Sequence, residues 1–295
     1  MAAAAGSELL RTPHRAKLSL CTAVSIATLV LIIGIGLVAN SMQGDVQPAE
    51  VQAVSSSVGF SNATLEVYLG NGCFWERQWA YFNVETNKTG PFSRNAVDFT
   101  AYAGYAGGED PPAGRGTSVC YHTGDARDYA HLGSAEAVRV TLDRKHSEAQ
   151  MAALARNFFD SFTGGHGSRQ RPDPMDRGSP YRSFAGFPGG MHSLLFTTFA
   201  KENTFGMRLK EGRGGDGDVY NTVWIYDTEE YPFYRGEVYH QNHCNFFPSE
   251  GMPYPDSYTD ELYKRMRATG KFIPTGCPEN PFSHSTCGGR GGLLG

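Results

Sequence analysis

Cys73 is the residue whose type and position best suit it for chemistry. It follows an expected strand at 65–69 and a glycine-containing turn at 70–72, and it begins an expected helix at 73–82. Unpaired N–H groups and the positive end of the helix dipole lie beside such a thiol, which lowers its pKa and favours the nucleophilic thiolate. A buried structural cysteine, or half of a disulfide, is the alternative for this position.

Glu136 is a candidate proton donor. It begins an expected strand at 136–142, in which Val138, Val140 and Leu142 share its parity and therefore its face. A carboxyl group on a buried face has its charged form disfavoured, so its pKa rises and it can act as an acid near neutral pH. The alternative is a frayed strand end at which Glu136 reaches water.

A metal centre is not expected. His240, His243 and Cys244 offer ligands at helical spacing, as a zinc site could use, but no second cluster completes the set. Cys120 and Cys244 are read as core thiols or as a mutual disulfide.

The elements that must position these residues mix strands and helices without a regular βαβ repeat, which predicts an α+β fold with long loops. A helix begins near a possible capping box of Ser147 and Gln150. The other expected elements are a strand at 97–102, irregular chain from 104 to 133, a loop at 163–190, β-prone runs at 192–199 and 219–226, and a helix at 257–269 ended by Gly270.

The amino-terminal segment differs from the rest of the chain. Residues 18–39 carry no charge over a length that could span a membrane, and basic residues precede them. We expect a single-pass signal anchor with a cytoplasmic tail at 1–17, a linker at 40–62, a domain at 63–272 and a flexible Gly-rich tail at 273–295. The domain would be lumenal or extracellular. A cleaved signal on a secreted protein and a plastid-targeted protein are the alternatives.

Composition excludes some classes of function. The chain has 26 Lys and Arg against 30 Asp and Glu, a net charge of −4, and this balance argues against a nucleic-acid-binding protein. Aromatic residues make up 12% of the chain, which is enough apolar surface to exclude wholesale disorder.

Five segments, in chain order, resemble motifs of the peptide methionine sulfoxide reductase A family. They are Gly72-Cys73-Phe74-Trp75, Gly104-Tyr105-Ala106-Gly107-Gly108, Ser134-Ala135-Glu136-Ala137-Val138, Asp176-Arg177-Gly178-Ser179-Pro180-Tyr181-Arg182-Ser183 and Glu237-Val238-Tyr239-His240-Gln241. The resemblance implies a two-layer α/β roll of ferredoxin-like kind.

The resemblance also implies reduction of the S epimer of methionine sulfoxide, peptide-bound or free, as protein repair under oxidative stress. Cys73 would attack the sulfoxide sulfur while Glu136 protonates the oxygen, and Phe74 and Trp75 would enclose the substrate methyl group. By motif position, Asp176 and Tyr181 would orient the oxygen or the Cys73 region. Tyr105, Glu237 and His240 would line the substrate site.

The family chemistry leaves Cys73 as a sulfenic acid that a second thiol resolves to a disulfide. Cys287 is the candidate, because the Gly-rich tail around it resembles the family's resolving cysteine, and Cys277 is the runner-up. A static Cys277–Cys287 bridge is the alternative. No prosthetic cofactor is implied, only an external dithiol reductant such as thioredoxin.

Three departures from the family pattern weaken the expectation of activity. Glu76 stands where the family has glycine, and its charge would raise the pKa of Cys73. Ser134 replaces a histidine, and a tyrosine of the family is missing, for which Tyr121 or Tyr129 could substitute. A non-catalytic, disulfide-bonded ectodomain that binds partners is therefore a competing hypothesis. A disulfide oxidoreductase would be expected to have a CxxC pair, which this sequence lacks.

Overall fold

The computed structural model describes residues 63–113, 118–165, 170, 171, 173, 175–215, 221–243, 264–266, 268–271 and 273–279. The predicted membrane anchor at 18–39, its flanking segments at 1–17 and 40–62, Cys244 and Cys287 all lie outside these residues. Within them, no helix combines the length and the apolar character that crossing a membrane requires.

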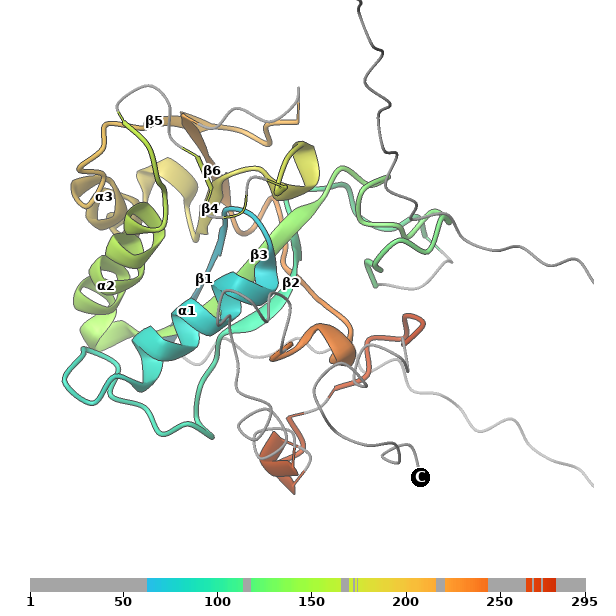
Figure 1. Cartoon of the computed structure of the whole chain (residues 1–295), viewed down its shortest axis with the longest axis horizontal. Coiled ribbons are helices and arrows are strands. Elements are labelled where there is room, and N and C mark those ends of the chain that lie inside the picture. The colour runs from blue at the N-terminus through green and yellow to red at the C-terminus, as the bar shows by residue number, and fades with distance from the viewer. Residues whose placement is uncertain are drawn as a thin grey trace, which may run out of the picture. The chain divides into compact units, whose positions relative to one another are not determined.

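The chain is a mixed α/β protein built on one sheet, which has seven strands among the described residues in the order β5-β6-β4-β1-β3-β2-β7. The strands are β1 Thr64–Gly70, β2 Tyr102–Ala106, β3 Ala135–Asp143, β4 Phe184–Phe187, β5 Arg208–Glu211, β6 Thr222–Asp227 and β7 Tyr234–Arg235. The α-helices are α1 Phe74–Thr86, α2 Ser147–Asp160 and α3 Leu194–Lys201, shown with the strands in Figure 1.

The four central strands are antiparallel neighbours, with β1 between β4 and β3 and with β2 outside β3. In chain order they follow the β-α-β-β-α-β connectivity, since α1 links β1 to β2 and α2 links β3 to β4. Strand β6 extends this core parallel to β4, and β5 lies parallel to β6. Strand β1 is thus central, and α1 begins just beyond its carboxyl end.

Side chains of the central strands alternate between two buried clusters, because successive residues of a strand point to opposite faces. Val67 and Leu69 belong to the large cluster that also contains core residues of the helices, whereas Tyr68 belongs to a smaller cluster on the other face. Val138 lies in the large cluster and Ala137 in the smaller one. The face of the sheet that carries the helices is therefore also the face toward which even-numbered residues of β3 point.

The strands predicted at 65–69, 136–142 and 219–226 correspond to β1, β3 and β6, but the strand predicted at 97–102 is wrong. The backbone amides of Thr100 and Ala101 donate to the carboxylate of Glu85 in α1, so this segment bonds to the helix and pairing begins at Tyr102. Gly104, expected in irregular chain, lies inside β2, where a Cβ would meet the carbonyl oxygen of Tyr234 at 2.2 Å.

Two further predictions about secondary structure are wrong. The segment predicted as a loop at 163–190 contains β4, which is fully buried between β1 and β6. The β-prone run at 192–199 contains α3, because the Ser193 hydroxyl accepts the backbone N–H of Leu195 and caps a helix that buries Leu195 and Phe199. Short strands β5 and β7 had no counterpart among the predictions.

The start of α2 uses other partners than the predicted capping box. The Gln150 side chain accepts the backbone N–H of Asp143 at 2.7 Å, and the Ser147 hydroxyl donates to the carbonyl of Arg144. Gln150 thereby ties the helix to the end of β3. Of the helix predicted at 257–269, residues 264–266 and 268 are helical, and 257–263 lie outside the described residues.

Candidate active site

Two carboxyl groups bind the first two backbone amides at the start of α1. The N–H of Cys73 donates to Asp176 Oδ2 at 2.7 Å, and the N–H of Phe74 donates to Glu136 Oε2 at 2.9 Å. Cys73 is the half-buried N-cap residue of α1, and it is the free cysteine of the described residues. The structure therefore brings together Cys73, Glu136 and Asp176, which are 103 residues apart at most.

Gly72 makes this arrangement possible. Its φ is +99°, and a Cβ at this position would meet Asp176 Oδ2 at 2.4 Å. The N–H of Gly72 also donates to the carbonyl oxygen of Tyr181 at 3.1 Å. Only glycine has both the conformational freedom and the open space that the approach of Asp176 requires.

Glu136 is buried, with 2% of its surface exposed, so the frayed-end alternative is wrong. Burial raises the pKa of its carboxyl group well above the usual range, and the nearby carboxylate of Asp176 adds to the rise, while the Phe74 N–H opposes it. This environment favours the protonated form of Glu136, directly beside the start of the helix that carries Cys73.

The pKa of the Cys73 thiol is raised, in contrast to the sequence-based expectation. Burial is the largest cause, followed by the carboxylates of Glu136 and Asp176, while hydrogen bonds from the N–H groups of Trp75 and Glu76 lower it. The helix terminus lowers the pKa of Cys73, as predicted, but desolvation raises this pKa by more. Because the same burial favours the protonated form of Glu136, its repulsion of a thiolate is felt only once it ionises.

Burial raises the pKa of Asp176 to about 6, and the Cys73 N–H opposes this rise. Glu76 contributes to it through its charge. The Glu76 carboxylate is hydrogen-bonded to Arg77, and the backbone N–H of Glu76 lowers the pKa of Cys73, whereas the effect of the Glu76 charge on Cys73 stays a prediction.

An aromatic wall lies beside Cys73. The ring of Phe74 lies 5.8 Å from that of Tyr105 and 4.8 Å from that of His240. Trp75 Nε1 donates to His240 Nδ1 at 3.0 Å, and burial lowers the pKa of His240 well below its usual value. His240 is therefore neutral, with its proton on Nε2. His243 stacks on Trp75 with ring centroids 3.8 Å apart.

Three tyrosines are close to Glu136. Tyr121 stacks on Tyr129 with centroids 5.5 Å apart and lies edge-on to His240 at 4.6 Å. Burial raises the pKa of Tyr121, Tyr129 and Tyr181, and the charge of Glu136 is the second cause for each of them. The sequence could not place Tyr121 and Tyr129, because both lie in irregular chain, and the fold brings them to the site.

Glu237, completely buried, connects this wall to the rest of the site. Its carboxylate accepts the hydroxyl of Tyr105 at 2.7 Å and the N–H of Tyr121 at 2.7 Å. Burial raises the pKa of Glu237.

Arg182, which the sequence motifs did not single out, is also buried and donates to the carbonyl oxygens of Gly107 and Gly133 at 2.9 and 3.0 Å. Arg182 thus joins its own motif segment to the one at 104–108 and to Gly133, the residue before a third segment.

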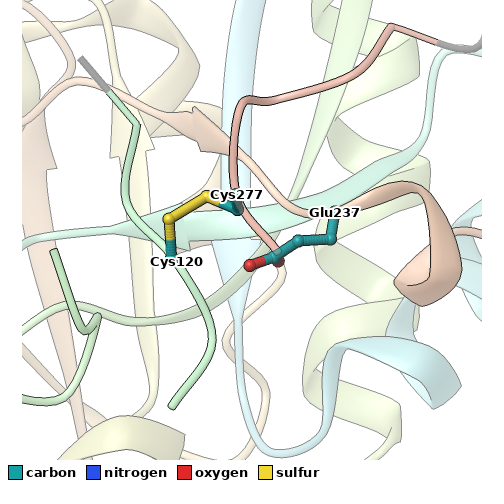
Figure 2. A group of neighbouring side chains, drawn as sticks. All are labelled: Cys120, Glu237 and Cys277. Atoms are coloured by element: carbon teal, nitrogen blue, oxygen red, sulfur yellow. A yellow bond between two sulfur atoms is a disulfide. The ribbon is translucent and has the colours of Figure 1, made fainter. Parts of the chain in front are cut away.

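Figure 2 shows a disulfide between Cys120 and Cys277, with Glu237 beside it. Bridges from Cys277 to Cys287 and from Cys120 to Cys244 are therefore wrong in this structure, because Cys120 and Cys277 are bonded to each other. Cys277 also has no free thiol with which to resolve Cys73. The predicted role of Cys287 lies outside the described residues.

No family model and no curated protein matches this chain. Among solved structures, reduced Mxr1 from Saccharomyces cerevisiae is 21% identical, with 65% of this chain and 88% of that chain covered and a TM-score of 0.36. Methionine sulfoxide reductase A of Corynebacterium diphtheriae is 16% identical, with 68% and 82% covered and a TM-score of 0.37. An oxidised form of Mxr1 is 20% identical, with 60% and 79% covered and a TM-score of 0.30.

Proposed function

We propose that this chain reduces methionine-S-sulfoxide to methionine, with Cys73 as the nucleophile and Glu136 as the proton donor. The observation that carries the proposal is the buried Glu136 carboxyl on the amide next to Cys73, in an environment that favours its protonated form. A proton donor beside a thiol is what reduction of a sulfoxide requires, since the oxygen must be protonated as its bond to sulfur breaks.

The reaction transfers one oxygen atom. The Cys73 sulfur attacks the sulfoxide sulfur, Glu136 gives its proton to the oxygen, and the sulfur–oxygen bond of the substrate breaks. The substrate sulfur gains two electrons, and Cys73, which loses two, keeps the oxygen as a sulfenic acid. The proton that the thiol releases restores Glu136, and methionine leaves.

The aromatic residues around Cys73 suit this substrate. Phe74 and Trp75 offer an apolar surface for the methyl group. Hydroxyl groups of Tyr121, Tyr129 and Tyr181, all close enough to Glu136 to respond to its charge, are donors for the sulfoxide oxygen. Tyr121 and Tyr129 would replace the tyrosine that the family motif has and this sequence lacks.

Turnover then requires a second thiol. In this proposal Cys287 condenses with the sulfenic acid, water leaves, and a thioredoxin-like dithiol reduces the disulfide formed. The β-α-β-β-α-β core supports a ferredoxin-like roll for the domain. A membrane anchor at 18–39 with the domain lumenal or extracellular, acting on oxidised proteins or free methionine sulfoxide, completes the proposal.

The test is reduction of an amino-terminally blocked methionine-S-sulfoxide by the purified full chain with dithiothreitol, with the R epimer in parallel. We expect turnover of the S epimer that is abolished in Cys73→Ser and reduced roughly 10²–10⁴-fold in Glu136→Gln. The matched controls are Cys21→Ser, which removes a thiol of the predicted anchor at 18–39, and Glu66→Gln, since Glu66 pairs with Arg139 at the sheet surface. Both controls should keep full activity.

Mass spectrometry after a single turnover without reductant distinguishes the steps. A gain of one oxygen or a new disulfide at Cys73 supports the proposal, and the partner in that disulfide identifies the resolving cysteine. A wild-type chain that folds but neither turns over the substrate nor oxidises Cys73 would refute the proposal. That result would favour the non-catalytic binding module.

A further inference from the structure

One group of side chains of the kinds that bind metals takes no part in the proposed reaction. The sulfur atoms of Cys120 and Cys277 and a carboxylate oxygen of Glu237 all lie within 4.8 Å of one another, and all three residues are buried. They come from three segments that are far apart in the sequence, as Figure 2 shows. From this geometry we propose a redox-gated Zn²⁺ site, which forms when the Cys120–Cys277 disulfide is reduced.

The donor set is suited to zinc. Two thiolates and one carboxylate are ligands that Zn²⁺ accepts in a tetrahedral arrangement, with the fourth position left to water. Ca²⁺ and Mg²⁺ prefer oxygen ligands, so the two sulfurs select against them. The site would therefore bind a borderline-soft cation in preference to a hard one.

The burial of the Glu237 carboxylate is a second argument for a bound cation. This carboxylate is completely buried, and its hydrogen bonds come from neutral donors: the Tyr105 hydroxyl, the Tyr121 amide and its own backbone amide. The Nε2 atom of neutral His240 lies 3.9 Å away. Buried carboxylates in proteins are usually paired with a cation or bound to a metal.

The disulfide and the metal exclude each other, because sulfurs that are bonded to each other lie closer together than two sulfurs on one zinc ion. An external dithiol reduces the bridge and becomes a disulfide itself, leaving two thiols. Zinc binding then releases their two protons as two zinc–sulfur bonds form. Of the two cysteines, Cys277 is the more exposed, at 9% against 0% for Cys120.

Either cross-link would hold the carboxyl-terminal segment against the candidate active site. Glu279, two residues after Cys277, accepts the N–H groups of Val238 and Tyr239, next to His240. The Ser118 hydroxyl bonds to the Thr275 carbonyl on the other side of the bridge. Zinc would therefore keep this segment in place under the reducing conditions that break the disulfide.

The test measures zinc bound by the full chain after reduction with a phosphine and removal of excess metal. We expect one zinc per reduced wild-type chain, none in the oxidised chain, none in Cys120→Ala/Cys277→Ala, and an affinity lowered roughly tenfold or more in Glu237→Gln. Near-ultraviolet circular dichroism of each variant reports whether its tertiary structure is retained.

Cys73→Ser and Glu136→Gln are the matched controls, because they remove a thiol and a buried carboxyl at the other site. Both should bind zinc like the wild type while losing reductase activity, so failure of this proposal and failure of the proposed function are distinguishable. Reduced wild type without zinc, zinc retained by Cys120→Ala/Cys277→Ala, or an unchanged affinity in folded Glu237→Gln would each overturn the site.

Discussion

The substitution Gly72→Ala probes the contact on which the geometry of Cys73 depends. A Cβ at residue 72 would lie 2.4 Å from Asp176 Oδ2, so this oxygen must withdraw by about 1 Å to reach a normal contact distance. Its 2.7 Å hydrogen bond from the Cys73 N–H would then be lost. Residue 72 also has a φ of +99°, which alanine adopts only with strain.

The expected magnitude follows from these two effects. The backbone strain costs about 1–3 kcal/mol, and loss of a hydrogen bond to a carboxylate costs about 1.5–3 kcal/mol. Gly212→Ala is the matched control, because its φ is +106° and no atom lies within 4 Å of its Cβ position. We therefore expect Gly72→Ala to be destabilised by about 2 kcal/mol more than Gly212→Ala.

Urea unfolding, followed by tryptophan fluorescence, measures the stability of both variants. Reductase assays should show kcat/KM reduced on the order of 10²-fold in Gly72→Ala and near the wild-type value in Gly212→Ala, because a displacement of about 1 Å at the nucleophile is costly. If the two variants lose equal stability and Gly72→Ala keeps its activity, the contact between Asp176 and Cys73 does not position the thiol.

Three other predictions concern charge and cross-linking. Because burial raises the pKa of Asp176 from 3.8 to about 6, the folded state favours its protonated form. The wild type should therefore gain stability relative to Asp176→Asn as the pH falls from about 6 to about 4. A difference in urea midpoint between the two proteins that stays constant across this range would contradict the raised pKa of Asp176. Because burial raises the pKa of Glu136, wild-type kcat should fall as the donor ionises at a pH above the ordinary range of a carboxyl group. Glu136→Gln should lack that limb, and a limb present in both would assign it to another group. Removing the 157-residue cross-link in Cys120→Ala/Cys277→Ala should lower the free energy of unfolding by about 3–5 kcal/mol, and an unchanged urea midpoint would rule out the bridge.

Local sequence patterns were sufficient to predict the strand that carries Glu136 and the helix that begins at Cys73. Alternation in 136–142 predicted both the strand and the inward direction of Glu136, because a strand has only two faces and the valines identify the buried one. The turn at 70–72 and the apolar residues after it predicted a helix that begins at Cys73. These predictions needed no information about distant residues.

Where competing partners lie far away in the sequence, local patterns failed. The run before Tyr102 has strand-like composition, but the Glu85 carboxylate binds its amides. The pKa of Cys73 was predicted from its neighbours in the chain, the helix terminus and Glu76, whereas burial and two carboxylates from other segments determine its direction. Desolvation is a property of the packed structure and cannot be read from a spacing of residues.

The sequence by itself determined which residue types meet in the site, since the five motif segments carry the thiol, the carboxyls and the aromatic rings. Only the tertiary structure decided that Tyr121 and Tyr129 join them and that Cys120 pairs with Cys277 beside Glu237. These residues lie in irregular chain, where no periodicity fixes the direction of a side chain. Their positions follow from contacts across more than 100 residues, which only the folded sheet and the segments packed on it provide.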